Sequence, residues 1–312
     1  MLHIARSCLS SLASLLLVSI FLVATIAPQA SALAIGSAEA RPNLIRDNDA
    51  AAAASKRIVL WDYTLTRDVG SVPGIKKSAA SLAKSKVTHT VINWETWRPS
   101  ELPANLIHEP TVRTPTYLSG DNWNNVKSAA TARKGLTVHF YNEPERQSPT
   151  VTAEQAAAQW KSHMVPLRKK FGAKLGSPAC AADATGTAWM DAFMSHLGAG
   201  EKPDFVGLHY YTAQDGNAKQ QVAAAQSYLQ GRHGKFGIPV SVREIASTSR
   251  TQGVVTDFTK QMSAWLDKQS WVHSYGFFGV SRMPVDSFVS PKAQLMGPQG
   301  DWTDLGRFFF AL

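Results

Sequence analysis

The sequence predicts an α/β protein whose main domain is a single (β/α)8 TIM-type barrel. Eight short segments are apolar and rich in β-branched or aromatic residues, as buried strands are, and helical patterns separate most of them. About 255 of the 312 residues follow Arg57, which is the typical length of such a barrel. Repeated strand–helix units with right-handed crossovers form a parallel sheet, and eight units favour its closure into a barrel.

The elements follow one another at regular intervals. Each helical pattern has one apolar stripe, as Trp160, Met164 and Leu167 show, and Thr152 with Gln155 matches a capping box at a helix start. The helical patterns cover 74–86, 122–134, 152–171, 184–198, 216–231, 255–269 and a short segment from Thr303. The predicted strands cover 58–64, 89–95, 111–118, 137–143, 173–179, 204–212, 239–245 and 272–279.

The first 32 residues have the pattern of a secretory signal peptide. Arg6 gives a basic start, residues 12–27 are apolar, and Ala30-Ser31-Ala32 is a cleavage pattern of small residues. The apolar run is too short to predict a membrane anchor in the mature protein. We therefore expect a secreted protein, extracellular or associated with a cell wall, that has no membrane segment after removal of the signal.

Residues 33–57 predict a flexible leader that is rich in alanine and has no strand or helix pattern of large apolar residues. Its last two residues, Lys56-Arg57, are either a processing site or the solvated edge of the first strand. The predicted boundaries are therefore 1–32 for the signal peptide, 33–57 for the leader and 58–312 for the catalytic barrel.

The composition narrows the classes of partner. A net charge of +9 and a pI near 9.6 are compatible with binding to nucleic acid, to anionic membranes or to an acidic polymer. The basic residues are scattered, however, and the densest group, Arg168-Lys169-Lys170, has no interleaved aromatic residues. We predict no nucleic-acid partner. Cys8 leaves with the signal peptide, so Cys180 has no intramolecular disulfide partner, and we expect a monomer.

Several enzyme classes lack their motifs in this sequence. It contains no glycine-rich dinucleotide fingerprint, no phosphate-binding loop and no Gly-x-Ser-x-Gly elbow. No two histidines flank a glutamate with the spacing of a zinc protease. We predict neither a metal nor an organic cofactor.

Two glutamates close predicted strands four and seven. Glu143 is the last residue of the predicted strand 137–143, in the segment Tyr141-Asn142-Glu143-Pro144, and Glu244 closes a strand about a hundred residues later. Because the carboxyl ends of barrel strands share one mouth, the two side chains are expected to meet there, as the two carboxyl groups of a glycoside hydrolase do. The alternative is a surface glutamate at 143 and, at 244, an ion pair helped by Arg243.

Polar and aromatic residues at other strand ends are candidates for substrate binding. Asn142 can bind a sugar hydroxyl beside Glu143. Alternation along a strand places His209 and Tyr211 on one face and Tyr210, as a packing residue, on the other. The aromatic candidates Trp61, Trp94 and Phe278 also lie at strand ends, where a sugar can stack on them, although each alone is more typical of packing.

Several motifs in one order resemble glycoside hydrolase family 128, which consists of secreted β-1,3-glucanases. The resemblance covers residues 135–308 well. It implies that Glu143 is the acid/base and Glu244 the nucleophile of a retaining enzyme that binds and cleaves β-1,3-glucan. The segments that carry it are Phe140–Glu145, Trp160–Pro166, Leu175–Ala179, Trp189–Phe193, His209–Tyr211, Phe277–Gly279 and Thr303–Gly306.

Some positions depart from the family pattern. Thr-Glu-Phe around the nucleophile is Arg243-Glu244-Ile245 here, which implies an altered sugar-binding surface. Strand alternation predicts that Arg243 points away from Glu244. Because a general acid needs a raised pKa, Glu143 is expected to be the more desolvated glutamate. Two alternatives stay open: a wall-associated glucan-binding barrel with little or no activity, and an enzyme that cuts another polysaccharide.

Overall fold

The computed structural model describes residues 56–312. The predicted signal peptide, and the leader up to its last two residues, lie outside this range. Within it, no helix is both long enough and apolar enough to cross a membrane.

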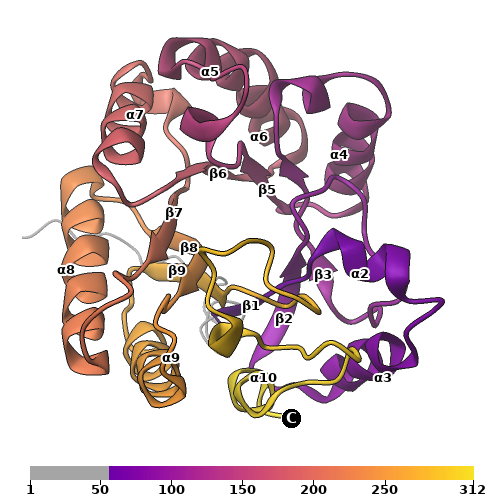
Figure 1. The fold of residues 1–312 in the computed structure, drawn as a ribbon. Coiled ribbons are helices and arrows are strands. Elements are labelled where there is room, and N and C mark those ends of the chain that lie inside the picture. Colours follow the sequence, from indigo (N-terminus) through magenta and orange to yellow (C-terminus); the bar gives the residue numbers. More distant parts are fainter. Residues whose placement is uncertain (1–55) are drawn as a thin grey trace, which may run out of the picture. The chain divides into compact units, whose positions relative to one another are not determined.

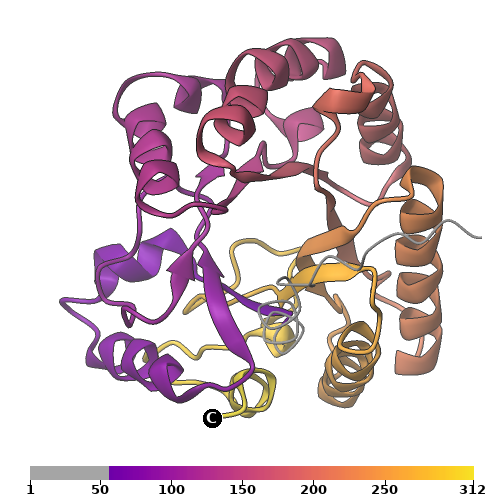
Figure 2. The same ribbon diagram turned by 180° about the vertical axis from the view of Figure 1, so that it is seen from behind.

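The strands of the described chain form one parallel sheet in the order β3-β2-β1-β9-β8-β7-β6-β5-β4. The ring of helices around them is visible from both sides (Figures 1 and 2). The strands are β1 (Arg57–Leu60), β2 (Thr88–Ile92), β3 (Ile107–His108), β4 (Thr111–Val112), β5 (Thr137–Phe140), β6 (Lys174–Cys180), β7 (Phe205–Tyr211), β8 (Val240–Ala246) and β9 (Val272–Phe277).

Strands β3 and β4 are the two halves of one barrel strand. Glu109, between them, donates its N–H to Val91 of β2, and the carbonyl of Pro110 accepts from His139 of β5. Pro110 has no N–H for the ladder, so the strand is interrupted at this point. The prediction of eight barrel strands is confirmed, but the predicted range 111–118 is wrong, because residues 115–118 form a 3₁₀ helix.

The helices lie mainly between successive strands. They are α2 (Tyr63–Asp68), α3 (Pro73–Ser81), α4 (Gly120–Ala132), α5 (Ala153–Gln159), α6 (Val165–Phe171), α7 (Ala184–Ser195), α8 (Ala218–Phe236), α9 (Gln252–Leu266) and α10 (Asp304–Phe310). The predicted helix 152–171 is α5 and α6, joined by a π-helical turn over Trp160–Met164. Pro166 explains the irregularity, because it cannot donate an intrahelical hydrogen bond.

The helices pack on the barrel through the predicted apolar stripes. Trp160, Met164 and Leu167 are buried, and the capping box of Thr152 and Gln155 is confirmed. This packing holds the carboxyl ends of the strands in fixed positions, so the side chains that follow them share one mouth.

Candidate active site

A cleft of about 880 Å³ lies at the carboxyl ends of β5 to β9. Both predicted catalytic glutamates line it, so the barrel brings together two residues that are far apart in the sequence. Its other lining residues are Asn142, Arg146, Ala181, Ala182, Asp183, Tyr210, Tyr211, Phe278, Val285, Asp286, Phe288 and Val289.

Glu143 follows β5 in a left-handed backbone conformation, with φ 42° and ψ 57°. This conformation is uncommon for a residue with a side chain and recurs at functional sites. Two hydrogen bonds hold the segment: the Glu143 N–H donates to Ala179 at 2.8 Å and the Asn142 N–H to Arg113 at 3.1 Å. Pro144 then begins a short 3₁₀ helix, Pro144–Arg146, whose last residue still lines the cleft.

Glu244 lies within β8, where the strand contains one extra residue. Opposite β7, Val242 pairs with Leu208, but the next pair joins Glu244 to His209. The register of β9 also shifts between Val242 and Ile245. The additional residue is a β-bulge, a feature that redirects side chains next to active sites.

Because of this bulge, the expected alternation of Arg243 and Glu244 is wrong, and both side chains enter the barrel. The Arg243 guanidinium is buried and donates to the carbonyl oxygens of Phe140, Tyr141 and Ser177. Burial lowers the pKa of Arg243 to about 10, which still leaves it charged at neutral pH. Arg243 of β8 is therefore hydrogen-bonded to β5 and β6 inside the barrel.

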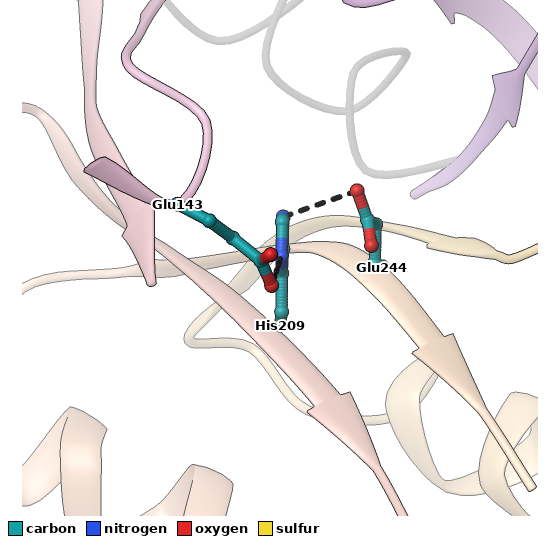
Figure 3. A group of neighbouring side chains, drawn as sticks. All are labelled: Glu143, His209 and Glu244. Carbon is teal, nitrogen blue, oxygen red and sulfur yellow. Dashed lines mark hydrogen bonds and ion pairs between the residues drawn. The ribbon is translucent and has the colours of Figure 1, made fainter. Parts of the chain in front are cut away.

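His209 lies between the two glutamates, hydrogen-bonded to Glu143 and within ion-pair distance of Glu244 (Figure 3). His209 Nδ1 lies 2.9 Å from Glu143 Oε1, and its Nε2 lies 3.5 Å from Glu244 Oε1. An oxygen of each carboxylate and a ring nitrogen lie within 4.8 Å of one another. Glu244 also accepts hydrogen bonds from Tyr211 at 2.7 Å and from the Trp94 indole at 3.0 Å.

The two carboxyl groups have different environments. The Glu244 side chain is 10% exposed, and burial raises its pKa despite the nearby His209 and its hydrogen bonds. The Glu143 side chain is 27% exposed; burial alone would raise its pKa, but the hydrogen bond and charge of His209 lower it. The expectation that Glu143 is the more desolvated residue is therefore wrong for the free protein, because Glu143 lies nearer the solvent.

Glu143, His209 and Glu244 also have the donor atoms and the proximity to hold a metal ion. Both oxygens of Glu244, however, already accept hydrogen bonds from Trp94 and Tyr211. A cation at Glu244 would have to compete with these two donors. The arrangement is better suited to sharing protons than to binding a metal.

Of the other predicted site residues, some line the cleft and others are buried beside it or in the core. Asn142, Tyr211 and Phe278 line the cleft, and the Phe278 ring contacts Trp94 at 5.7 Å between centroids. Trp94 is 8% exposed and orients Glu244. The prediction that Trp61 binds substrate is wrong: its side chain is fully buried and its indole N–H donates to Glu101.

The structure adds lining residues that the sequence did not indicate. Tyr210 was predicted to pack, and it does contact Tyr228, but it also lines the cleft. Arg146 and Asp183 form an ion pair at the rim. Residues 285–289 lie in an irregular connection after β9, where no periodic pattern marks them. Their one sequence signal is the presence of three apolar residues in a loop, namely Val285, Phe288 and Val289.

Comparisons with known proteins agree with this geometry. A family described as "Glycosyl hydrolase catalytic core" matches residues 72–309. The chain is 35% identical to an exo-β-1,3-glucanase of glycoside hydrolase family 128, subgroup VI, from Aureobasidium namibiae, with a TM-score of 0.71 over 83% of this chain and 96% of that one. A search of curated proteins found no match.

More distant structures share the fold. A subgroup IV endo-β-1,3-glucanase from Lentinula edodes is 21% identical, with a TM-score of 0.64 over 83% of this chain and 100% of that one. A subgroup I endo-β-1,3-glucanase from Amycolatopsis mediterranei, in complex with laminaritriose, is 22% identical, with a TM-score of 0.60 over 82% and 98%.

The barrel and its two facing glutamates, together with these matches, define the protein as a glycoside hydrolase. The chain belongs to the glycosyl hydrolase catalytic-core family and, within it, to glycoside hydrolase family 128. The resemblance seen in the sequence motifs is confirmed.

Proposed function

We propose that the protein is a secreted, retaining glycoside hydrolase that cleaves β-1,3-glucan by double displacement. The observation that carries this proposal is the proximity of Glu143 and Glu244, which have oxygens within 4.8 Å of each other. Retaining enzymes hold their carboxyl groups about 5–5.5 Å apart, whereas inverting enzymes need about 6.5–9.5 Å to admit a water molecule. The 35% identical exo-β-1,3-glucanase supports the choice of substrate, and the signal pattern of residues 1–32 supports secretion.

In the first step, Glu244 attacks the anomeric carbon while Glu143 gives its proton to the departing glycosidic oxygen. The bond to the leaving sugar breaks and an ester to Glu244 forms. Glu244 suits attack because Trp94 and Tyr211 fix both of its oxygens. Glu143, which is more exposed, suits contact with the leaving group.

Glu143 must hold a proton for this step, although its pKa is lowered in the free protein. A bound sugar removes water from Glu143, and this desolvation raises the pKa of the carboxyl. The change favours the protonated form at the moment when a proton donor is needed.

In the second step, Glu143 takes a proton from water, and the resulting nucleophile attacks the anomeric carbon and releases Glu244. Esterification has removed the negative charge of Glu244 from the neighbourhood of Glu143. The loss of a nearby like charge lowers the pKa of Glu143, which favours its role as a base. Two displacements at one carbon leave the β configuration unchanged.

Azide rescue of two variants tests these roles. Both Glu143→Ala and Glu244→Ala should release reducing ends from laminarin at least about 10²-fold more slowly. On a β-glucoside with a good leaving group, azide should restore turnover of Glu143→Ala with a β-glycosyl azide product, and of Glu244→Ala with an α-glycosyl azide product. Glu154→Gln, an exposed glutamate on α5, is the matched control.

The same assay separates the alternatives. Normal turnover by Glu244→Ala would show that Glu244 is not the nucleophile. If the unmutated protein binds laminari-oligosaccharides and releases no product, it is a glucan-binding barrel. Turnover only on other β-glucans or on mannans would replace the proposed substrate.

A further inference from the structure

A second polar and aromatic group lies across the barrel mouth from the cleft. It consists of Tyr63, Glu95, Arg113 and Tyr117, and we call it the Arg113 cluster. Its members follow β1, β2 and β4, whereas the walls of the cleft follow β5 to β9. Tyr63 begins α2, which lies beside β2 and β3 in Figure 1.

Arg113 is held between two aromatic rings. Its guanidinium carbon lies 5.6 Å from the ring centre of Tyr63 and 5.5 Å from that of Tyr117. Nη2 lies 3.2 Å from Glu95 Oε1 and donates to the Tyr117 hydroxyl at 3.1 Å. That hydroxyl donates in turn to Glu95 Oε2 at 2.7 Å. These contacts fix the guanidinium in place before any ligand arrives.

The Arg113 cluster still has groups available for a ligand. Tyr63 is 44% exposed and the Arg113 side chain 33% exposed, while the Glu95 side chain is 9% exposed. Within residues 56–312, the hydrogen bonds of Arg113 use only Nη2 of its side chain, which leaves the N–H groups of Nε and Nη1 available.

The cluster is directly connected to the residues around the catalytic pair. Glu95 follows Trp94, whose indole donates to Glu244. The main-chain carbonyl of Arg113 accepts the Asn142 N–H, one residue before Glu143. The cluster therefore lies at the same carboxyl end of the barrel strands as the two glutamates.

The chemistry of the cluster indicates a neutral, hydroxyl-rich ligand. Because the charge of Arg113 is balanced by Glu95, the pair offers little net attraction to an anion. An aromatic ring packs against the C–H face of a sugar, and free N–H groups donate to its hydroxyls. We propose that Tyr63 and Arg113 form a subsite for a glucose unit of the glucan chain, on the β1–β4 side of the scissile bond; this rests on the proposed function.

Binding measured without turnover tests the subsite. In the Glu244→Gln background, calorimetric titration with laminari-oligosaccharides of increasing length should show a gain in affinity once the chain reaches Tyr63. Tyr63→Ala and Arg113→Lys should each weaken binding of the longer ligands about 5- to 10-fold, which removes that gain. Both should leave the affinity for the shortest ligand unchanged. Phe308→Ala, another exposed aromatic residue beside cationic side chains, but on α10, is the matched control and should retain the gain.

The possible outcomes are distinct. If the Glu244→Gln protein binds no laminari-oligosaccharide, the proposed function fails and the subsite with it. If it binds but Tyr63→Ala keeps the full gain with length, only the subsite is overturned. Arg113 lies within a packed network, so thermal unfolding must confirm that Arg113→Lys is folded; Tyr63 is exposed enough for its variant to decide the question alone.

Discussion

At the residue scale, His209 lies between the two carboxylates and favours the ionised form of both. His209 is buried, and Glu244 and Glu143 together raise its pKa against the effect of burial. Its charge and hydrogen bond lower the pKa of Glu143. The imidazole thus couples the acid to the nucleophile.

Replacement of His209 should move the pH profile. In His209→Gln the positive charge is absent, so the pKa of Glu143 rises, and the alkaline limb of kcat/KM, which reports the protonated acid, should shift to higher pH. The rate itself should fall, because both carboxylates lose a partner. An alkaline limb at the wild-type position would show that His209 does not set the pKa of Glu143.

Tyr211 should matter through its hydroxyl rather than its ring. Tyr211→Phe keeps the ring against Phe278 but removes a 2.7 Å hydrogen bond to Glu244. A hydrogen bond to a charged group contributes about 1.5–3 kcal/mol, so kcat/KM should fall about 10- to 100-fold. Tyr210→Phe should cause a much smaller loss, because among the described residues the Tyr210 hydroxyl makes no hydrogen bond to either carboxylate. Equal losses in the two variants would contradict the role of the hydroxyl.

The sequence was sufficient to predict some of the site residues but not others. Glu143, Glu244, His209 and Tyr211 were predictable because each ends a strand and barrel strands end at one mouth. Trp61 also ends a strand, but its ring packs on Trp302 inside the protein. The sequence pattern of an aromatic residue is the same whether it lines a cleft or fills a core, so it could not separate these cases.

At the scale of elements, the bulge in β8 allows Arg243 and Glu244 to enter the barrel together. The Arg243 guanidinium passes close to Gly207 of β7, where an added Cβ would lie 2.6 Å from its Nη2 and 2.9 Å from the carbonyl oxygen of Pro178. No side chain fits there without displacement of Arg243. A bulge leaves no mark in the apolar pattern of a strand, which is why alternation gave the wrong orientation.

Gly207→Ala should therefore destabilise the barrel. Overpacking of a filled interior costs about 1–3 kcal/mol, which urea unfolding can measure as a lower midpoint. Gly231→Ala is the control: it lies within α8 with nothing within 4 Å of the added Cβ, and it should leave stability unchanged or raise it by up to about 1 kcal/mol. An unchanged midpoint for Gly207→Ala would contradict the close fit of Arg243.

At the scale of the whole molecule, the barrel interior contains a second buried ionisable pair. His139 Nε2 lies 2.7 Å from Glu109 Oε2, and neither residue lines the cleft. Burial raises the pKa of Glu109 from 4.5 to about 7, against the effect of nearby basic groups led by His273. Burial also lowers the pKa of His139. The position of this pair between β3, β4 and β5 depends on the interrupted strand, which the sequence did not predict.

This pair should make folding stability depend on pH. A carboxyl with a raised pKa stabilises the folded state most when it is protonated, below its unfolded pKa of about 4.5, and this contribution is lost as pH rises through about 7. Glu109→Gln removes the ionisation, so between pH 5 and 8 the unfolding free energy of the wild type should decline relative to the variant, by on the order of 2 kcal/mol. Parallel curves for the two proteins across this range would refute the assignment.

The central claim for the molecule is that Glu143 and Glu244 act on opposite sides of one anomeric carbon in two successive displacements. The most direct test is proton NMR of the anomeric signals during the first minutes of laminari-oligosaccharide hydrolysis, before mutarotation. We expect the β anomer to accumulate first and the α anomer to follow slowly. Initial formation of the α anomer would show inversion by a single displacement and would contradict the account.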